Sequence, residues 1–417
     1  MKSATFLVVG AGDRGRKYSV YAETFPEKMK IVGVAEPIDF YRNQMQETYS
    51  IPVDNIFCDW KAAAAKPKMA DAVIISTQDN MHTEPALAFA KLGYHILLEK
   101  PMAPTEAECR EIVKTAKENE VMFSVCHVLR YTSYTQKLKQ LLVDGAIGEI
   151  ISMQHLEPVG YWHQAHSFVR GNWRNQTEST FMLLAKSCHD LDWISYIMGV
   201  KCRSVSSFGS LRHFRADQKP DGASDRCMSC PEAVENNCPY SAKRLYFKYL
   251  DMGYTGWPLH VLTENPNKEN LTKALEEGPY GRCVYACDND VVDHQVVAME
   301  FEGEKTATFT MTAFTDLTDR RTRIFGTRGE LSGDGKTIEV FDFLTNKKTK
   351  YDTTLKSNVM QGHGGGDFGI MDNFVSAILE ENPDKIITGS DETLESHLMV
   401  FASERARLNR TVEDIIS

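Results

Sequence analysis

The stretch TFLVVGAGDRG, residues 5–15, decides the fold. An apolar run of strand length leads directly into G-x-G-x-x-G, and a helix-compatible segment follows. This order is typical of the opening βαβ unit of a dinucleotide-binding domain. Gly10 permits the tight turn, Gly12 lets the backbone approach a pyrophosphate, and Gly15 lets the helix pack close to the strand. The predicted contacts of the phosphates at the helix N-terminus are Gly10, Gly12, Asp13, Arg14 and Gly15.

A second buried strand is expected at residues 30–35, and it ends at Glu36, 21 residues beyond Gly15. A carboxylate there can accept hydrogen bonds from the adenosine ribose hydroxyls, and it would repel a 2′-phosphate. The sequence therefore favours NAD over NADP, although Arg42 nearby is a feature that would suit NADP. The alternative interpretation is a glycine turn in some other α/β protein.

Length and composition describe a globular protein of two domains. The chain has 417 residues, more than one core usually supports. Its formal charge of −10 argues against a nucleic-acid surface, which needs clustered Lys and Arg. No apolar run approaches the ~20 residues of a membrane span, and the N-terminal run reads as a strand rather than a signal peptide. We expect a cytoplasmic protein that binds neither nucleic acid nor membrane.

The first third alternates strands and helices, as a parallel doubly wound sheet requires. Further strands are expected at 71–76, 94–98 and 121–126, and helices at 39–49, 83–92 and 105–119. Thr105 and Glu108 have the spacing of a capping box, which marks the start of the last of these helices.

Several motifs then resemble one family. They are the turn and Glu36 already described, residues 77–82, the Glu99-Lys100-Pro101 motif after a strand, residues 127–131, residues 145–150 and the helix around His189. Together they resemble the glucose-fructose oxidoreductase, inositol dehydrogenase and MocA family over nearly the whole chain. The resemblance implies an N-terminal Rossmann parallel sheet, placed at 1–128, and a C-terminal α/β domain with a large, mostly antiparallel open sheet, placed at 129–417. It also implies a sugar or cyclitol substrate and a homodimer or homotetramer.

The second half agrees with this architecture on its own terms. Segments 150–157, 202–211, 291–301, 306–314, 321–325 and 337–343 are β-rich, with no regular helix between several of them. Such a succession indicates hairpins and an antiparallel sheet with one covered face. Helices are expected at 180–198, 367–379 and 392–408, and Asp367 is expected to be an N-cap.

Lys100 is the first candidate catalytic residue. It follows a buried strand, and groups just beyond strand C-termini face the ligand crevice of an open α/β sheet. An ammonium there can hydrogen-bond a substrate hydroxyl, favour the developing alkoxide and relay its proton. A surface lysine before a helix is the alternative interpretation; the resemblance implies the catalytic one.

His189 is the second candidate, because a neutral imidazole beside an alcohol can act as a general base. A structural histidine within a helix is the alternative, and the resemblance implies that His189 is the base. Many relatives carry an acidic residue four positions earlier, where this chain has Ala185, so Lys186 and Asp190 are candidate substitutes.

Further residues are expected around the same crevice. Candidate cofactor contacts are Thr77, Gln78, Asn80, His82, Glu99, Lys100 and His127. Candidate substrate contacts are Arg130, Tyr161, Trp162, Trp173, Lys186, Asp190 and His363, because a polyol needs both polar groups and flat apolar faces. The alternatives are loop capping for the Thr, Gln and Asn side chains and core packing for the aromatic ones.

Five of the ten cysteines lie within an insert at about 212–290. Cys227, Cys230 and Cys238 have a spacing at which thiolates can meet on one tetrahedral zinc, with Cys283 or Cys287 as the fourth ligand. The sequence therefore predicts a structural zinc site made by Cys227, Cys230, Cys238 and Cys283. An iron–sulfur cluster and unrelated buried thiols are the alternatives.

Three functions fit these patterns. The first is an NAD-dependent oxidoreductase that takes hydride from a CH–OH carbon of a sugar, sugar derivative or cyclitol. The second is a redox-cycling glycosidase that keeps and regenerates a tightly bound NAD. The third is a non-catalytic regulator that binds NAD or a sugar, and the presence of Lys100 and His189 argues against it.

Overall fold

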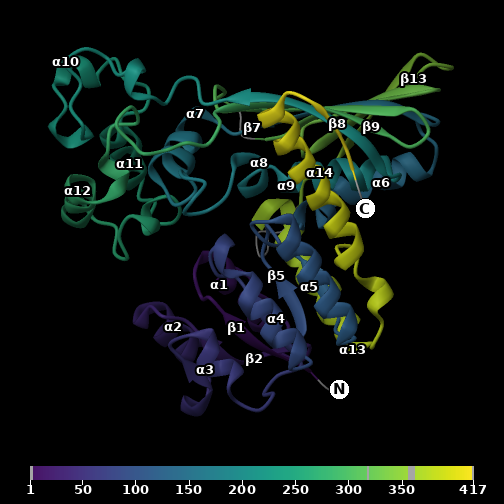
Figure 1. Cartoon of the computed structure of the whole chain (residues 1–417), viewed down its shortest axis with the longest axis horizontal. Helices are drawn as coiled ribbons and strands as arrows, with labels where there is room; N and C mark the ends of the chain where they lie inside the picture. Colours follow the sequence, from purple (N-terminus) through teal and green to yellow (C-terminus); the bar gives the residue numbers. More distant parts are fainter. Residues whose placement is uncertain (1–2, 317–318, 356–361, 416–417) are drawn as a thin grey trace.

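The computed structural model describes residues 3–316, 319–355 and 362–415 of the chain. Two sheets organise it, one of six strands and one of nine. Figure 1 shows the six-stranded sheet in the purple and blue N-terminal part, the nine-stranded sheet in the opposite part, and a cluster of short helices beside the latter. This arrangement confirms the α/β fold class.

The six-stranded sheet is parallel throughout, with the order β3-β2-β1-β4-β5-β6. Its strands are β1 (Ala4–Val9), β2 (Met29–Ala35), β3 (Ile56–Phe57), β4 (Ala72–Ile75), β5 (His95–Leu98) and β6 (Phe123–Val125). The connecting helices are α1 (Asp13–Thr24), α2 (Asp39–Tyr49), α3 (Trp60–Ala64), α4 (Thr83–Lys91) and α5 (Glu106–Glu118). Thr105 caps α5 by accepting a hydrogen bond from the backbone N–H of Glu108, as the capping box predicts.

The two faces of this sheet are covered from different parts of the chain. Leu7 and Val9 of β1 point into the apolar cluster that contains α4 and α5, whereas Phe6 and Val8 point to α1. On the latter side α13 (Gly366–Leu379) completes the cover, with Phe374 packed edge-on against Phe6 at 6.2 Å between ring centroids. A helix from near the C-terminus therefore belongs to the core of the N-terminal sheet.

The nine-stranded sheet has the order β14-β13-β12-β11-β7-β10-β9-β8-β15. Its strands are β7 (Ile150–Pro158), β8 (Cys202–Ser210), β9 (His294–Phe301), β10 (Lys305–Thr312), β11 (Arg321–Gly326), β12 (Gly329–Gly333), β13 (Thr337–Asp342), β14 (Lys347–Asp352) and β15 (Val412–Asp414). All neighbours are antiparallel except β7 and β10. The prediction of a mostly antiparallel sheet is confirmed, although β12, β14 and β15 were not expected.

Helices α6 (Ser133–Val143), α9 (Cys188–Met198) and α14 (Ser390–Asn409) accompany this sheet, and α14 runs from it toward the parallel sheet (Figure 1). The single helix expected at 180–198 is wrong. It is divided into α8 (Met182–Ala185) and α9, with Lys186 and Ser187 between them. Because α8 ends at Ala185, the carbonyl of this residue has no hydrogen-bond donor within the helix and needs one from another part of the chain.

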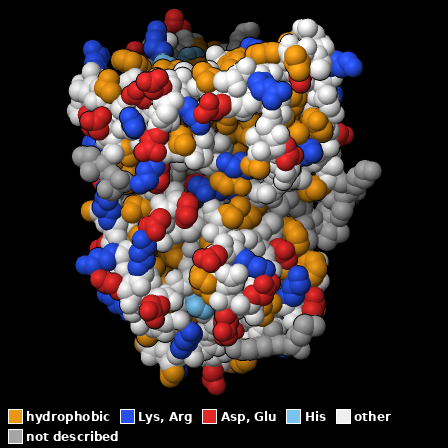
Figure 2. All heavy atoms as spheres, turned by 90° about the vertical axis from the view of Figure 1, so that its right-hand side faces the viewer, with side chains coloured by type: hydrophobic (Ala, Val, Ile, Leu, Met, Phe, Trp, Pro, Cys, Tyr) orange, Lys and Arg blue, Asp and Glu red, His pale blue; other side chains and the backbone are white. Residues whose placement is uncertain are grey.

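The insert forms the small helices α10 (Glu232–Glu235), α11 (Ala242–Asp251) and α12 (Lys268–Glu277), near α7 (Tyr161–His163) (Figure 1). On the face drawn in Figure 2, acidic and basic side chains are interspersed rather than gathered by sign. Among the described residues, no helix is long and apolar enough to cross a membrane.

Candidate active site

The glycine turn after β1 has the geometry that its motif predicts. Gly10 has a φ of +86°, and a Cβ there would lie 2.7 Å from the carbonyl oxygen of Ser76. A Cβ on Gly15 would lie 2.1 Å from the oxygen of Gly10, so α1 can approach the turn only with glycine. A Cβ on Gly12 would meet nothing within 4 Å. This open space at the N-terminus of α1 fits the pyrophosphate of a dinucleotide.

Glu36 holds the same turn from the end of β2. Its carboxylate is buried, and it accepts hydrogen bonds from the backbone N–H of Ala11 at 2.6 Å and of Ile38 at 2.9 Å. Each carboxylate oxygen has a second lone pair, which leaves capacity to accept from ribose hydroxyls. Arg42 is already engaged, because its guanidinium contacts Asp39 and the carbonyl of Glu36.

The Glu99-Lys100-Pro101 motif follows β5 and is anchored by ion pairs. Glu99 accepts hydrogen bonds from Arg14 at 2.7 Å and from the Tyr18 hydroxyl at 2.6 Å. Burial alone would raise the pKa of Glu99, but Arg14 and Lys100 bring it below its usual range. The guanidinium of Arg14 also binds Asp367 at 2.7 Å. Arg14 therefore fastens α1 to the motif and to α13 instead of facing a phosphate freely.

The expectation that Asp367 is an N-cap is wrong. Gly365 occupies that position in α13, and the Asp367 carboxylate instead binds Arg14 and the imidazole of His363, which lies 2.9 Å away. Sequence spacing could not reveal the Arg14 partner, which is 353 positions away.

Lys100 reaches across the boundary between the two sheets. Its ammonium donates a hydrogen bond of 2.6 Å to the carbonyl of Ala185, the last residue of α8. Position 185, which has no acidic side chain in this protein, thus supplies a backbone oxygen. Lys100 is half-buried, so its charge lies at the edge of the crevice.

His189 lies on α9, close to this ammonium. Its ring centroid is 5.6 Å from that of His127 and 6.4 Å from that of His363. Burial, together with Lys100, His127 and Arg320, holds the pKa of His189 well below its usual range. The imidazole is therefore neutral at neutral pH and can accept a proton.

Two predicted contacts, His82 and Arg130, are buried within the protein. His82 faces the carbonyls of Pro101 at 2.7 Å and Thr77 at 3.2 Å, so it ties the loop after β4 to the Glu99-Lys100-Pro101 turn. Arg130 pairs with Asp192 through two hydrogen bonds of 2.8 and 2.6 Å. The expectation that Arg130 and His82 face a ligand is not supported, because their polar atoms already have protein partners.

His127 is fully buried, and neither ring nitrogen has a hydrogen-bond partner among the described residues. Burial lowers the pKa of His127 to about 3, which keeps the ring neutral. It packs between the rings of His189 and His397. The ring is thus close to the candidate base, although the sequence predicted it only as a cofactor contact.

The loop after β4 approaches the second half of the chain. The Thr77 hydroxyl donates to the carbonyl of Met81, and the Asn80 amide donates to the carbonyl of Glu178, while Gln78 is exposed. Trp173 donates from its indole to Asp79 at 3.2 Å. Trp173 therefore joins this loop to the second half rather than lining the cavity described next.

A cavity of about 410 Å³ opens beside His363 and Lys186. Of the predicted substrate contacts it is lined by Trp162, Lys186 and His363; Tyr161 is not among the lining residues, and Asp190 lies behind the wall with no exposed surface. Sequence reasoning missed several lining residues, namely His155, Trp193, Trp257, Arg320 and Lys336. The sequence patterns indicated a helix at Trp193 and a strand at His155, but not which way these side chains point.

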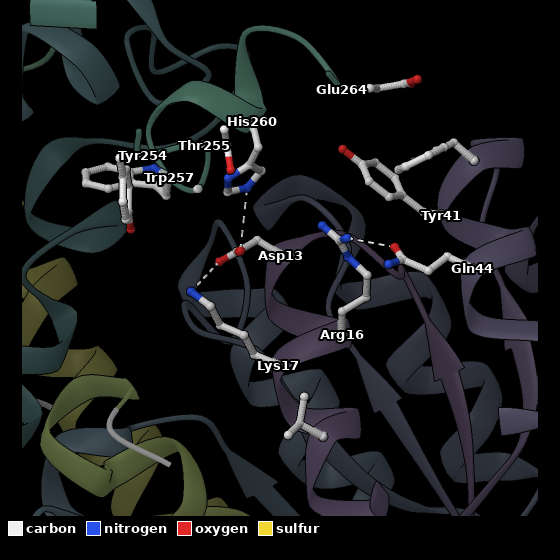
Figure 3. Close-up of a pocket in the computed structure, with 13 residues that line it drawn as sticks. Asp13, Arg16, Lys17, Tyr41, Gln44, Tyr254, Thr255, Trp257, His260 and Glu264 are labelled. Carbon is white, nitrogen blue, oxygen red and sulfur yellow. Dashed lines mark hydrogen bonds and ion pairs between the residues drawn. The ribbon is translucent and has the colours of Figure 1, made fainter. Parts of the chain in front are cut away.

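The insert makes a second cavity, of about 540 Å³, against α1 and α2. Figure 3 shows Asp13 between His260 of the insert and Lys17 of α1, at 3.6 and 2.8 Å respectively. Arg16 lies across the ring of Tyr41 and donates to Gln44. The insert therefore touches the first residue of α1, where the dinucleotide pyrophosphate is expected.

The predicted zinc site is not supported. Within the described part of the chain, no group of three or more His, Cys, Asp or Glu side chains is arranged to hold a metal ion. Cys227, Cys230, Cys238 and Cys283 do surround one cavity of about 20 Å³. However, Cys227 packs into the apolar cluster of α11 and α12, whereas Cys283 packs into a different cluster with Val169 and Phe214. Cys227 and Cys283 thus belong to different apolar clusters, and both residues border this cavity.

Two family models match the chain. The oxidoreductase family model with an NAD-binding Rossmann fold matches residues 4–127, and the oxidoreductase family model of a C-terminal alpha/beta domain matches residues 139–413. Together they span both sheets.

Proteins with similar sequences or structures include oxidoreductases, a hydratase and a dehydrogenase. The oxidoreductase-family protein YteT of Bacillus subtilis is 22% identical over 86% of both chains. The 2,7-anhydro-N-acetylneuraminate hydratase of Escherichia coli is 30% identical over 36% of this chain and 40% of its own. A structure of levoglucosan dehydrogenase in complex with NADH and levoglucosan superposes with a TM-score of 0.71 at 17% identity and covers both chains fully. The chain belongs to the Gfo/Idh/MocA oxidoreductase family, with an NAD-binding Rossmann fold followed by the family's C-terminal α/β domain.

Proposed function

We propose that the protein oxidises a CH–OH carbon of a sugar, sugar derivative or cyclitol, with NAD as hydride acceptor. The observation that carries this proposal is the position of Lys100, whose ammonium lies at the end of β5 and is held by the carbonyl of Ala185. His189 lies beside it as a neutral base. Family relatives named as levoglucosan and scyllo-inositol dehydrogenases support the same substrate class.

NAD supplies the acceptor carbon for the hydride, and the open turn at Gly12 fits its pyrophosphate. Glu36 orients that turn and offers oxygens to the ribose. Lys100 binds the substrate hydroxyl and stabilises negative charge that develops on its oxygen. His189 accepts the hydroxyl proton as the C–H bond breaks, because its pKa is lowered and the ring is unprotonated.

NAD is the expected cofactor rather than NADP. A 2′-phosphate would approach the buried carboxylate of Glu36. Arg42, the nearby cation, already binds Asp39 and the carbonyl of Glu36. Its charge is thus partly neutralised within the protein.

A second candidate is redox cycling, in which NAD stays bound and the hydride returns to the substrate after elimination and addition of water. The contact between His260 and Asp13 favours it, because the insert lies against the turn that holds the pyrophosphate (Figure 3). A covered cofactor would leave slowly. The relatives named as anhydro-sugar hydratases fit this candidate, as would a glycosidase.

We further propose that the protein acts in the cytoplasm as a homodimer or homotetramer. The uncovered face of the nine-stranded sheet supports an interface, since it exposes Phe208 beside Val296 on neighbouring strands. Light scattering of the purified protein measures the mass directly, and a monomeric mass would contradict this part of the proposal.

The experiment that separates the two candidates is a paired assay on sugars, inositols and chromogenic glycosides. It reads reduced nicotinamide and released or hydrated product in the same sample. NADH that accumulates in proportion to substrate establishes a dehydrogenase. Product in large excess over bound cofactor, without net NADH, establishes redox cycling, and neither signal from any substrate contradicts the proposed function.

A further inference from the structure

The cavity of about 410 Å³ lies next to the proposed reaction site, because residues adjacent to that site form part of its wall. Lys186, on its wall, is the residue after Ala185, whose carbonyl holds Lys100. His363, also on the wall, lies beside His189. A molecule whose reacting carbon approaches Lys100 and His189 would therefore extend into this cavity.

Two cations on the wall of the cavity, Lys186 and Arg320, have counterions that lie behind it. The side chains of Lys186 and Arg320 are 20% and 22% exposed, whereas those of their partners Glu157 and Asp190 are 2% and 0% exposed. Lys336 adds a third cation, paired with Asp319, the only acidic side chain on the wall among the described residues. A ligand in the cavity thus meets positive groups first.

The buried carboxylates fix these cations in place. Asp190 binds Arg320 through two hydrogen bonds of 2.5 and 3.1 Å, and Glu157 lies 3.1 Å from the ammonium of Lys186 and 3.0 Å from Arg320. Burial by itself would raise the pKa of Asp190, but Arg320 holds it well below its usual range. The Asp190–Arg320 pair therefore remains charged across the neutral range, and Arg320 is already held in place on the wall of the cavity.

The rest of the wall suits a sugar ring. Trp162, Trp193 and Trp257 supply flat apolar surfaces, and the wall also includes Thr132 and Thr322. A pyranose has C–H faces that pack on aromatic rings and an equator of hydroxyls. The combination of aromatic faces with fixed cations therefore differs from a site for a neutral polyol.

We propose that the substrate is a sugar acid, whose carboxylate is bound by Lys186 and Arg320 while its ring lies against the tryptophans. This inference rests on the proposed function, because it places the acid beside Lys100 and His189. The proposed function does not specify the charge of the substrate, and this inference assigns it a negative charge. Lys186 and Arg320 are the residues that determine this specificity.

The test compares matched pairs, glucose with glucuronate and galactose with galacturonate, on the NAD-loaded protein. The uronate should have a kcat/KM about 10- to 100-fold above its neutral match, as a charge-assisted hydrogen bond allows. Lys186→Gln should lower kcat/KM for the uronate about tenfold, mainly through KM, and should lower it clearly less for the neutral sugar. Lys186→Arg should restore most of the loss. Lys348→Gln, which removes an exposed lysine paired with Glu339, is the matched control.

Equal or better turnover of the neutral sugars would overturn the sugar-acid proposal while the oxidoreductase proposal stands. An equal loss on both sugars in Lys186→Gln would also overturn it.

Should no sugar reduce NAD or form product, the proposed function fails, and calorimetry with the NADH-loaded protein decides this inference separately. Uronate binding that Lys186→Gln weakens supports it, and uronate binding no tighter than that of the neutral match overturns it. Gluconate, an open-chain acid, tests whether the pyranose ring contributes to binding affinity. If gluconate bound as tightly as the uronate, the proposed packing of the ring against the tryptophans would be overturned.

Discussion

The ammonium of Lys100 and the backbone carbonyl of Ala185 are 2.6 Å apart and connect the two halves of the chain at the candidate active site. Lys100 follows a strand of the parallel sheet, whereas Ala185 ends a short helix that belongs to the second half of the chain. Because the acceptor is a backbone oxygen, the contact does not depend on an acidic side chain at position 185. The placement of the lysine thus follows from the break between α8 and α9.

Replacement of Lys100 by Met should abolish turnover without loss of cofactor. The variant loses the group that binds the substrate hydroxyl, and general acid–base contributions of this kind amount to about 10²- to 10⁴-fold. Tryptophan fluorescence quenching should show NADH binding within about threefold of wild type. Lys114→Met, on the exposed face of α5, is the control. Turnover by Lys100→Met within about tenfold of wild type would remove Lys100 from the mechanism.

His189→Asn should lower kcat by about 10²-fold or more, because the base is lost. In the wild type, the lowered pKa keeps His189 neutral well below the ordinary histidine value of 6.5. The acid limb of the kcat/KM profile should therefore lie clearly below pH 6.5. An acid limb near pH 6.5 that His189→Asn removes would contradict the burial argument.

Glu36→Ala should weaken NAD binding about tenfold or more, since the variant loses the ribose acceptor and the tie to Ala11. The difference in affinity between NAD and NADP should also become smaller, because the carboxylate that repels the 2′-phosphate is gone. Calorimetric titration with both cofactors measures this, with exposed Glu47→Ala on α2 as the control. An unchanged NAD affinity would show that Glu36 does not contribute to the cofactor site.

His260→Ala should speed the release of NAD if the insert covers the cofactor. The substitution removes the contact with Asp13 but leaves Lys17 as the partner of that carboxylate. Stopped-flow displacement of NADH gives the release rate, and an increase of about threefold or more is expected. A release rate that equals that of wild type would contradict the role of the insert in retaining NAD.

His397 should make the protein sensitive to acid. Its Nε2 accepts from the backbone N–H of Met102 and its Nδ1 donates to the carbonyl of Thr393, which requires a neutral ring. Burial lowers its pKa from 6.5 to about 4. Between these values the unfolded chain binds a proton that the folded chain does not, so stability falls as the pH falls from about 6.5 toward 4.

His397→Gln keeps a donor and an acceptor but does not titrate. The slope of the free energy of unfolding against pH, measured by denaturant between pH 5 and 6, should decrease by about 1 kcal/mol per pH unit. An unaltered slope in His397→Gln would contradict the assignment.

The sequence was sufficient for those features that depend on local patterns. The Gly10 to Gly15 turn, the strand before Lys100 and the capping of α5 by Thr105 all follow from residues close together in the chain. β14 was missed because its residues are mostly polar and exposed, so neither apolar alternation nor a continuous apolar run marks it.

Long-range partners could not be predicted in the same way. Arg14 was expected to face phosphate, but the arrival of α13 on the parallel sheet gives it Asp367 as a partner. Arg320 was overlooked because it lies in the loop after β10, and only the folded chain brings this loop to its partner Asp190. The zinc site was predicted from the spacing of the cysteines. That spacing does not reveal that Cys227 and Cys283 pack into two different apolar clusters.

The central claim is that hydride passes from a carbinol carbon to NAD at Lys100. The most direct measurement is a single-turnover stopped-flow experiment that mixes the NAD-loaded protein with the uronates and neutral sugars and follows reduced nicotinamide. We expect a burst of reduced nicotinamide in the wild type, whether the hydride is then released or returned, and no burst in Lys100→Met that still binds NAD. A burst of equal rate in both proteins would show that hydride transfer does not need Lys100.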